Sequence, residues 1–257
     1  MRHIKTCLRY PGGKFYGFKV LEPFLLVPHN EFREVFVGGA SIYLGKEKSE
    51  VNWINDIDKE LINFYKVISN EDSKKELYNL LHKEEANKKR HAEVLNMEVN
   101  SDVENAFKYF YLNRTSFSGI MNKPRWGYAL GSSVTPDRWT KIIEPVSVKM
   151  KDTKITSLDF RKVIEKESKK DVLLYLDPPY FKASKSIYKN EFKLEDHQDL
   201  CKLLKETKFK FILSYEDSPE VRKMYDWAKI HETNFTYFMS EARRQNGCEL
   251  IITNFDI

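Results

Sequence analysis

The sequence is poor in the residues that build metal sites and disulfide frameworks. Its 257 residues include three cysteines, Cys7, Cys201 and Cys248, and six histidines. Neither residue type recurs at a spacing used for zinc ligands or for a small disulfide-bonded scaffold. We therefore expect reduced thiols, no metal site and a cytoplasmic protein.

Long apolar runs, internal repeats and low-complexity tracts are also missing. A membrane-spanning helix needs about 20 mostly apolar residues, and a secretory signal needs a basic stretch followed by an apolar one. We therefore expect no membrane segment and no export. The net charge of +5 is mild, so it is compatible with a polyanionic partner without being diagnostic of one.

What the sequence does contain is organised around residues 172–181, which read Val-Leu-Leu-Tyr-Leu-Asp-Pro-Pro-Tyr-Phe. The apolar run is typical of a central strand in a parallel sheet that is covered on both faces. Pro178 and Pro179 cannot continue the hydrogen-bond ladder, so we expect the strand to end at Asp177. Ligands of open α/β sheets bind outside the carboxyl ends of the strands. Asp177 and Tyr180 are therefore candidate site residues.

The chemistry of this loop suits a flat ring that carries an exocyclic amino group. The Asp177 carboxylate and the Pro178 carbonyl are hydrogen-bond acceptors, Pro179 has no N–H, and Tyr180 offers a stacking face. Hydrogen bonds to both N–H groups favour the pyramidal nitrogen of a transition state over the planar ground state. These four residues are the predicted catalytic residues. A strand end followed by a turn explains a bare Asp-Pro-Pro about equally well, but the full Asp-Pro-Pro-Tyr-Phe favours the catalytic interpretation.

Two earlier segments predict a nucleotide-type cofactor. Glu34 to Val37 is interpreted as a short apolar strand that runs into Gly38-Gly39, where glycine lets a ligand approach the backbone. A second strand, from Val51, ends at Asp56, close to the roughly 20-residue offset of a ribose-binding acid. The pattern fits S-adenosylmethionine as well as NAD, and the lack of a complete G-x-G-x-x-G argues against NAD.

Together these segments resemble the Dam-like (D12) class of DNA adenine-N6 methyltransferases. The resemblance runs from Arg9 to Phe255 and rests on motifs in a fixed order: aromatic-Pro-Gly-Gly-Lys, Phe-Val-Gly-Gly-Ala-Ser, Asn-Asp, Asn-Arg-x-x-Phe-x-Gly, Asp-Phe and Asp-Pro-Pro-Tyr. Val35 stands where the family usually has proline. The resemblance implies an α/β, Rossmann-like sheet, S-adenosylmethionine as cofactor, and methyl transfer to N6 of an adenine flipped out of double-stranded DNA.

The resemblance also implies a set of cofactor-binding residues: Tyr10, Gly12, Gly13, Lys14, Phe36, Gly38, Gly39, Ala40, Ser41, Asp56, Asp159, Phe160 and Asp177. Lys14 would reach towards the cofactor or the target base. Asp159 would accept a hydrogen bond from the cofactor adenine, and Phe160 would pack on its ring. On residue type alone, an N-capping Asp159 beside a buried Phe160 is comparably plausible, and Lys14 is more typical of a solvated surface lysine.

Residues 70–150 are predicted to form a mainly helical target-recognition insert between two parts of the catalytic domain, 1–69 and 151–257. The segment from Asn113 to Tyr128 mixes cations with aromatics, as nucleic-acid contacts often do. Candidate DNA contacts are Arg114, Lys123 and Arg125 in this segment, and Arg243 and Arg244 in a predicted hairpin tip at 241–247 with its turn at Asn246-Gly247. The basic run from Lys88 to His91 fits a solvated helix and a phosphate-facing surface about equally.

Two alternatives compete with DNA methylation. The same acceptor loop can serve methylation of RNA adenine or protein glutamine, although the Asn-Arg-x-x-Phe-x-Gly segment favours DNA. A non-catalytic DNA-binding relic is disfavoured because the acceptor loop is intact. A cognate restriction endonuclease is a candidate partner.

Overall fold

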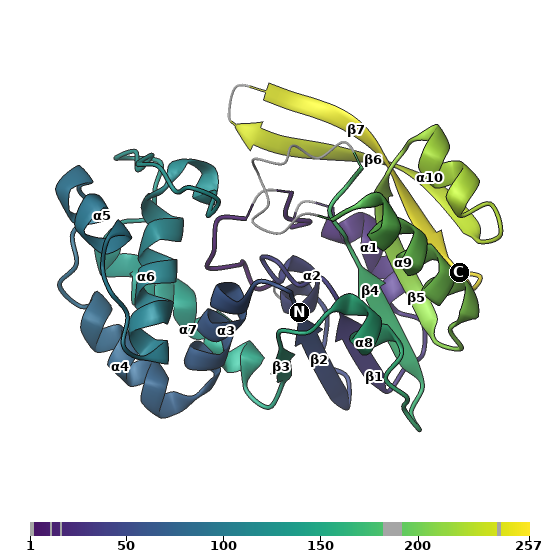
Figure 1. Cartoon of the computed structure of the whole chain (residues 1–257), viewed down its shortest axis with the longest axis horizontal. Helices are drawn as coiled ribbons and strands as arrows, with labels where there is room; N and C mark the ends of the chain where they lie inside the picture. Colours follow the sequence, from purple (N-terminus) through teal and green to yellow (C-terminus); the bar gives the residue numbers. More distant parts are fainter. Residues whose placement is uncertain (1–2, 11, 16, 182–191, 241–242) are drawn as a thin grey trace.

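Figure 1 shows the computed structural model of the chain, in which a twisted sheet lies beside a lobe of helices. The structure describes residues 3–10, 12–15, 17–181, 192–240 and 243–257, except for the side chains of 234–248. Within these residues, seven strands form one sheet in the order β3-β2-β1-β4-β5-β7-β6. Their bounds are β1 Glu31–Glu34, β2 Val51–Asn55, β3 Lys154–Thr156, β4 Val172–Leu176, β5 Lys210–Glu216, β6 Lys229–Ser240 and β7 Arg243–Thr253.

Strands β1 to β5 run parallel, and only β6 and β7 are antiparallel to their neighbours. Such a sheet needs cover on both faces. Helices α1 (Phe18–Leu25), α2 (Ser41–Gly45) and α3 (Lys59–Ser69) pack on one face, and α8 (Phe160–Ile164), α9 (Leu194–Glu206) and α10 (Pro219–Met224) pack on the other. The predicted α/β class with a Rossmann-like sheet is confirmed.

Strand β4 lies at the centre of the sheet and is buried along its whole length. Successive side chains of a strand point to opposite faces. Leu173 and Tyr175 accordingly join the hydrophobic cluster that contains α3, whereas Leu174 and Leu176 join the cluster that contains α9. The predicted strand therefore forms where the apolar run lies, and it stops immediately before Asp177.

Strand β1 differs from the prediction. The expected strand was the apolar segment from Glu34 to Val37, but the structure has β1 at Glu31–Glu34, with every residue buried. After Glu34 the chain leaves the regular ladder but still bonds to both neighbouring strands. Val35 N donates to Tyr175 O of β4 at 3.0 Å, and Val37 N donates to Asn55 O of β2 at 2.8 Å. Charged residues fit in this strand because Arg33 Nε donates to Glu31 Oε1 at 2.7 Å.

The segment between β2 and β3 is mostly helical, as predicted for the insert. Figure 1 shows these helices gathered in a lobe beside the sheet. Phe64 of α3 stacks on Phe110 at a centroid distance of 5.4 Å, and Trp139 packs edge-on against Phe110 at 5.6 Å. The core therefore continues from α3 into the lobe, and the division at residues 70 and 150 stays a prediction. The bounds are α4 Glu71–Leu81, α5 Lys88–Leu95, α6 Asp102–Thr115, η1 Phe117–Gly119, η2 Pro136–Arg138 and α7 Trp139–Met150.

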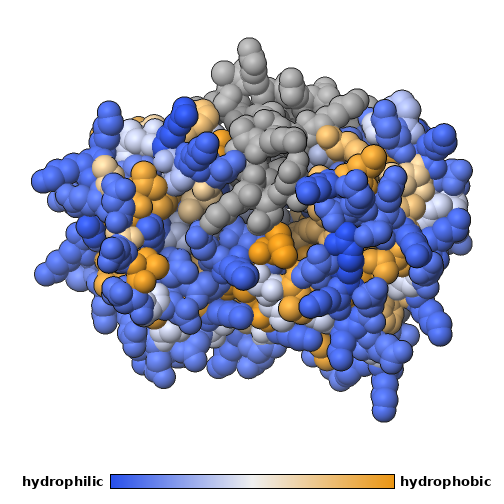
Figure 2. Space-filling view, in the orientation of Figure 1, coloured by the Kyte–Doolittle hydropathy of each residue, from blue (hydrophilic) through white to orange (hydrophobic). Residues whose placement is uncertain are grey.

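Strands β6 and β7 form a long hairpin that extends beyond the other strands (yellow, Figure 1). The predicted turn at Asn246-Gly247 is wrong, because Asn246 pairs with Thr236 and Gly247 pairs with Phe235 inside the ladder. The side chains of Arg243 and Arg244 lie outside the described residues. The face of the molecule shown in Figure 2 is mainly hydrophilic. Among the described helices, none is long and apolar enough to cross a bilayer.

Candidate functional site

A pocket opens at the carboxyl edge of β1, β2 and β4. Each of these strands delivers a short segment to its wall: the glycine turn after β1, Asp56 after β2 and Asp177 after β4. The N-terminal loop closes another side. The lining residues that the sequence had suggested are Tyr10, Gly12, Gly13, Lys14, Phe36, Gly38, Gly39, Ser41, Asp56, Asp159, Phe160, Asp177, Pro179 and Tyr180.

The glycine turn needs glycine because Tyr10 packs directly against it. Gly38 has a φ of +44°, and a Cβ added there would lie 2.7 Å from Cε1 of Tyr10. The Asp56 carboxylate fixes the turn, since its Oδ2 accepts a hydrogen bond from Gly38 N at 2.9 Å. Burial raises the pKa of Asp56 to about 6, against the lowering effect of hydrogen bonds from Asp58 and Gly38. The turn and the acid thus form one unit of the pocket wall.

The pocket wall is rich in carboxylates. Glu34, Asp56 and Asp177 all line it. Burial raises the pKa of Glu34 well above its ordinary value, and the charges of Asp177 and Asp56 raise it further. A ligand that carries positive charge would favour the ionised form of these acids and bring their raised pKa values down. Ser41 also lines the pocket, and its buried Oγ has no hydrogen-bond partner among the described residues.

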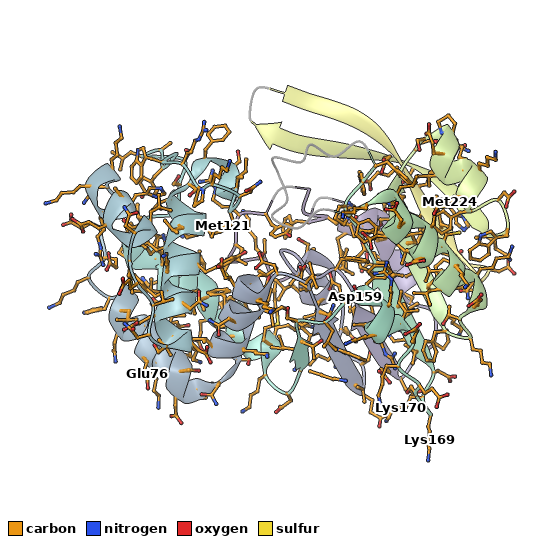
Figure 3. The ribbon with its side chains drawn as sticks, viewed as in Figure 1. Glu76, Met121, Asp159, Lys169, Lys170 and Met224 are labelled. Atoms are coloured by element: carbon orange, nitrogen blue, oxygen red, sulfur yellow. The ribbon has the colours of Figure 1, made fainter. Side chains whose placement is uncertain are left out.

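The other end of the pocket is aromatic. Phe160 lies 5.7 Å from Phe36 and 5.4 Å from Phe192, measured between ring centroids. Asp159 caps α8 by accepting from Arg161 N at 2.9 Å, and it pairs with the Arg161 guanidinium at 3.1 Å. Figure 3 labels Asp159 near the middle of the molecule, at the start of α8. The capping interpretation of Asp159 is correct, and its carboxylate also lines the pocket.

Lys14 joins the N-terminal loop to the loop after β4. Its Nζ lies 2.9 Å from Asp177 Oδ1, 3.2 Å from Glu249 Oε1 and 2.8 Å from the Tyr180 hydroxyl. The Tyr180 hydroxyl in turn donates to Glu249. Burial alone would lower the pKa of Lys14, but Asp177 and Glu249 raise it above its ordinary value, so the ammonium is charged. Lys14 is 5% exposed, which rules out the solvated surface lysine suggested by its type.

Two of the carboxylates near this site were not predicted from the sequence as site residues. Glu34 was placed in an apolar strand. Glu249 stands alone before the apolar run of β7, without a motif around it. Because β7 is antiparallel to β5, it brings Glu249 to the same edge at which β4 ends. The only sequence signal for Glu34 and Glu249 as site residues was the position of each acid next to an apolar run.

Two predicted residues do not line the pocket. Ala40 is fully buried and is the N-cap residue of α2, with a left-handed φ of +57°. Pro178 is buried between Asp177 and Pro179. Ala40 therefore supports the pocket wall through the backbone geometry that leads into α2.

The candidate DNA contacts of the insert fall into two groups. Arg114 is 7% exposed, and its Nη1 donates to Cys7 O at 3.4 Å. Burial and the charge of Arg9 lower the pKa of Arg114 to about 10. This buried position argues against contact between Arg114 and a phosphate. Lys123 and Arg125 are exposed in the loop after η1, whose Arg125 carbonyl accepts from Phe117 N at 2.8 Å.

Taken together, the parallel sheet, the glycine turn with its acid, and the aromatic end define an α/β protein with a ligand site at the carboxyl ends of its strands. Comparison with known families agrees: a family model described as D12 class N6 adenine-specific DNA methyltransferase matches residues 10–239. The chain belongs to this family, and its enzymatic class is that of an adenine-specific DNA methyltransferase.

Two curated relatives are similar over nearly the whole chain. The type II methyltransferase M.CviBI of Paramecium bursaria Chlorella virus NC1A is 26% identical over 262 residues, covering 98% of this chain and 100% of that protein. The DNA N-6-adenine-methyltransferase of Escherichia phage P1 is 26% identical over 264 residues, covering 95% of this chain but 33% of that protein. The chain thus spans a third of the length of the phage protein.

Proposed function

We propose that the chain transfers a methyl group from S-adenosylmethionine to N6 of an adenine that has left the stack of double-stranded DNA. The observation that carries the proposal is the Asp177 carboxylate in the pocket wall. Its Oδ1 accepts from Lys14, and no described residue hydrogen-bonds to Oδ2. An acceptor is therefore available to an amino group that enters beside Tyr180.

The pocket fits S-adenosylmethionine in charge and in polarity. Its carboxylates suit a cationic ligand, its aromatic end suits an adenine ring, and the unpartnered Ser41 Oγ suits a polar group of the ligand. We propose that Asp56 holds the ribose, and that Asp159 and Phe160 hold the adenine. When bound, the cofactor supplies a methyl group on a positively charged sulfur, open to attack by a nitrogen lone pair.

The residues after β4 prepare the target nitrogen for that attack. Asp177 and the Pro178 carbonyl accept its two N–H groups, which favours the pyramidal nitrogen of the transition state. Tyr180 stacks on the base, a contact worth about 1 to 3 kcal/mol by analogy with single-strand platforms. It recovers part of the few kcal/mol that extrusion of the base costs. Positioning is the main source of rate, and Asp177 accepts the proton that the nitrogen loses.

We further propose double-stranded DNA as the partner, the cytoplasm as the compartment, and a cognate restriction endonuclease as a companion activity. Family membership supports DNA. The name of the viral relative, a type II methyltransferase, supports the endonuclease. The isolated cysteines support a reducing compartment.

The test supplies labelled S-adenosylmethionine with unmethylated DNA, RNA or a mixture of proteins, followed by digestion and identification of the labelled product. We expect N6-methyladenine in DNA alone. Label in RNA or protein would assign the acceptor loop to a different substrate, and label in none of the three would indicate a binding protein. Asp177→Ala should abolish transfer, because this carboxylate accepts from the target amine.

A further inference from the structure

Glu249 is a buried carboxylate that contacts Tyr180, in the loop after β4, from outside the pocket. It is 1% exposed and does not line the pocket. It nevertheless contacts two residues that do: its Oε1 lies 3.2 Å from Lys14 Nζ and accepts from the Tyr180 hydroxyl. Its Oε2 has no hydrogen-bond partner within the described part of the chain. Taking a carboxylate out of water costs free energy, which its contacts with Lys14 and Tyr180 must offset.

Lys14 is shared between two carboxylates. Its Nζ is 2.9 Å from Asp177 Oδ1 and 3.2 Å from Glu249 Oε1. If Asp177 were the only acid beside this ammonium, the ion pair would neutralise the charge with which Asp177 attracts the target amine. The negative charge of a second carboxylate, Glu249, offsets part of the positive potential that Lys14 exerts on Asp177. Asp177 thereby stays a stronger acceptor for the amine and for the proton that it loses.

Tyr180 is held through its hydroxyl. The hydroxyl accepts from Lys14 Nζ at 2.8 Å and donates to Glu249, and it lies 3.5 Å from Asp177 Oδ1. The Tyr180 ring also packs against the ring of Tyr215, with centroids 5.8 Å apart. A ring fixed at both its face and its hydroxyl loses little conformational freedom when a base stacks on it.

We propose that Glu249 is a positioning residue for methyl transfer: it divides the charge of Lys14 with Asp177 and fixes the Tyr180 ring against which the target base stacks. This inference rests on the proposed function. Glu249 touches neither the target base nor the cofactor. Its effect should therefore appear in the rate of the chemical step and hardly at all in cofactor binding.

The first test compares Glu249→Gln with Glu31→Gln. Glu31 is a matched control because it is also a buried glutamate in an ion pair, with Arg33 at 2.7 Å, but it lies at the opposite end of the sheet. We expect Glu249→Gln to slow single-turnover methylation by about 100-fold, the loss typical of a misplaced reacting group. Its dissociation constant for S-adenosylmethionine should change less than about threefold, and Glu31→Gln should methylate at the parent rate.

The outcomes separate this inference from the proposed function. If the parent chain does not methylate DNA, the proposed function fails. If the parent methylates DNA and Glu249→Gln matches its rate, the positioning role is wrong. The role is also wrong if Glu249→Gln loses cofactor affinity in proportion to its rate, or if Glu31→Gln loses as much rate, because a general loss of structure would then explain the effect.

A second test measures the coupling between Glu249 and the Tyr180 hydroxyl. Single-turnover rates are compared for Glu249→Ala, which removes the oxygen that accepts from the hydroxyl, for Tyr180→Phe and for the double variant. Tyr180→Phe keeps the ring, so it folds with its stacking face intact and remains informative even if Glu249→Ala is unstable. We expect Tyr180→Phe to be slower than the parent, and the losses of the two single variants not to multiply in the double variant. Losses that multiply fully, or a Tyr180→Phe variant as fast as the parent, would overturn the link between Glu249 and the stacking ring.

Discussion

Asp56 has two tasks at one position. Its carboxylate accepts backbone hydrogen bonds from Gly38 and Asp58 at 2.9 and 3.0 Å, and in the proposed function it also holds the cofactor ribose. We predict that Asp56→Ala weakens binding of S-adenosylmethionine by roughly 1.5 to 3 kcal/mol, the usual contribution of hydrogen bonds to a charged acceptor. Titration calorimetry measures the change. An unchanged affinity would remove Asp56 from the cofactor site.

Glu249 should also give the protein a characteristic dependence of stability on pH. Burial and the charge of Asp177 raise its pKa to about 7, although Lys14 and Tyr180 oppose the shift. An acid with a raised pKa in the folded state binds its proton more tightly there than in the unfolded chain. Its contribution to stability is complete below about pH 4.5, its pKa when unperturbed, and is lost as the pH rises through about 7. The shift of Asp177 has the same direction, through its enclosed position.

We therefore predict that Glu249→Gln gains stability relative to the parent as the pH rises from 5 to 8, by about 1 to 3 kcal/mol. Urea unfolding at several pH values measures this difference. Glu31→Gln is the control: the ion pair and hydrogen bonds of Glu31 outweigh burial and lower its pKa, so its contribution to stability changes below about pH 4.5 and the difference between parent and Glu31→Gln should stay nearly constant from pH 5 to 8. A difference between parent and Glu249→Gln that does not change with pH would contradict the raised pKa.

Among the elements, the last turn of α6 is joined to the N-terminal loop by Asn113. Its Oδ1 accepts from Arg9 N, and its Nδ2 donates to Arg9 O, both at 2.9 Å. Gly119 comes close to the same carbonyl: with a φ of +69°, a Cβ added there would lie 2.2 Å from Arg9 O. The segment Asn-Arg-x-x-Phe-x-Gly thus connects the insert to the loop that carries Tyr10 and Lys14.

We predict that Gly119→Ala destabilises the protein and weakens cofactor binding, because the loop that carries Tyr10 must shift. Gly131→Ala is the control: Gly131 has a φ of +88°, but nothing lies within 4 Å of an added Cβ. Both variants bear the strain of a positive φ, so the difference between them isolates the contact with Arg9. We expect Gly119→Ala to be less stable than Gly131→Ala by about 1 to 3 kcal/mol in thermal or urea unfolding. Equal stabilities would show that the two loops move independently.

Elements with strong local signals could be predicted from the sequence. Strand β4 and its end at Asp177 follow from an apolar run and two prolines, and the cap of α3 follows from Asp58, whose carboxylate accepts from Glu60 N and Leu61 N. Strand β1 could not be predicted, because Glu31 and Arg33 look exposed until the fold pairs them. Glu249 reaches the site only through pairing between distant strands, and Arg114 is buried by packing that its charge does not reveal.

For the whole molecule, the helical lobe and the sheet share a hydrophobic core, and the loop that carries Lys123 and Arg125 is joined to the end of α6 by the bridge between Ser116 and Trp126. These two cations are exposed, and the net charge is +5. A phosphate contact should weaken binding to all sequences alike and lower the salt slope by about one, whereas a base contact should relax specificity at one position by roughly 1 to 3 kcal/mol.

We predict that Lys123→Ala and Arg125→Ala each show one of these two effects. Methylation of a randomised DNA library measures site preference, and binding at several salt concentrations measures the slope. Lys169→Ala is a suitable control, because Figure 3 shows Lys169 at the far edge of the sheet domain, away from the lobe. Variants at Lys123 and Arg125 that behave like Lys169→Ala would place the recognition surface elsewhere.

Lys14, Asp177 and Glu249 form a charge cluster whose members come from the N-terminal loop, the end of β4 and strand β7. The three side chains meet only when β7 has paired with β5. During synthesis, a chain that has released β4 from the ribosome but still holds β7 inside it has the pocket residues without the carboxylate that balances Lys14. On the role proposed for Glu249, such a nascent chain methylates poorly. Pairing of β7 with β5 is then the folding step that completes the charge cluster.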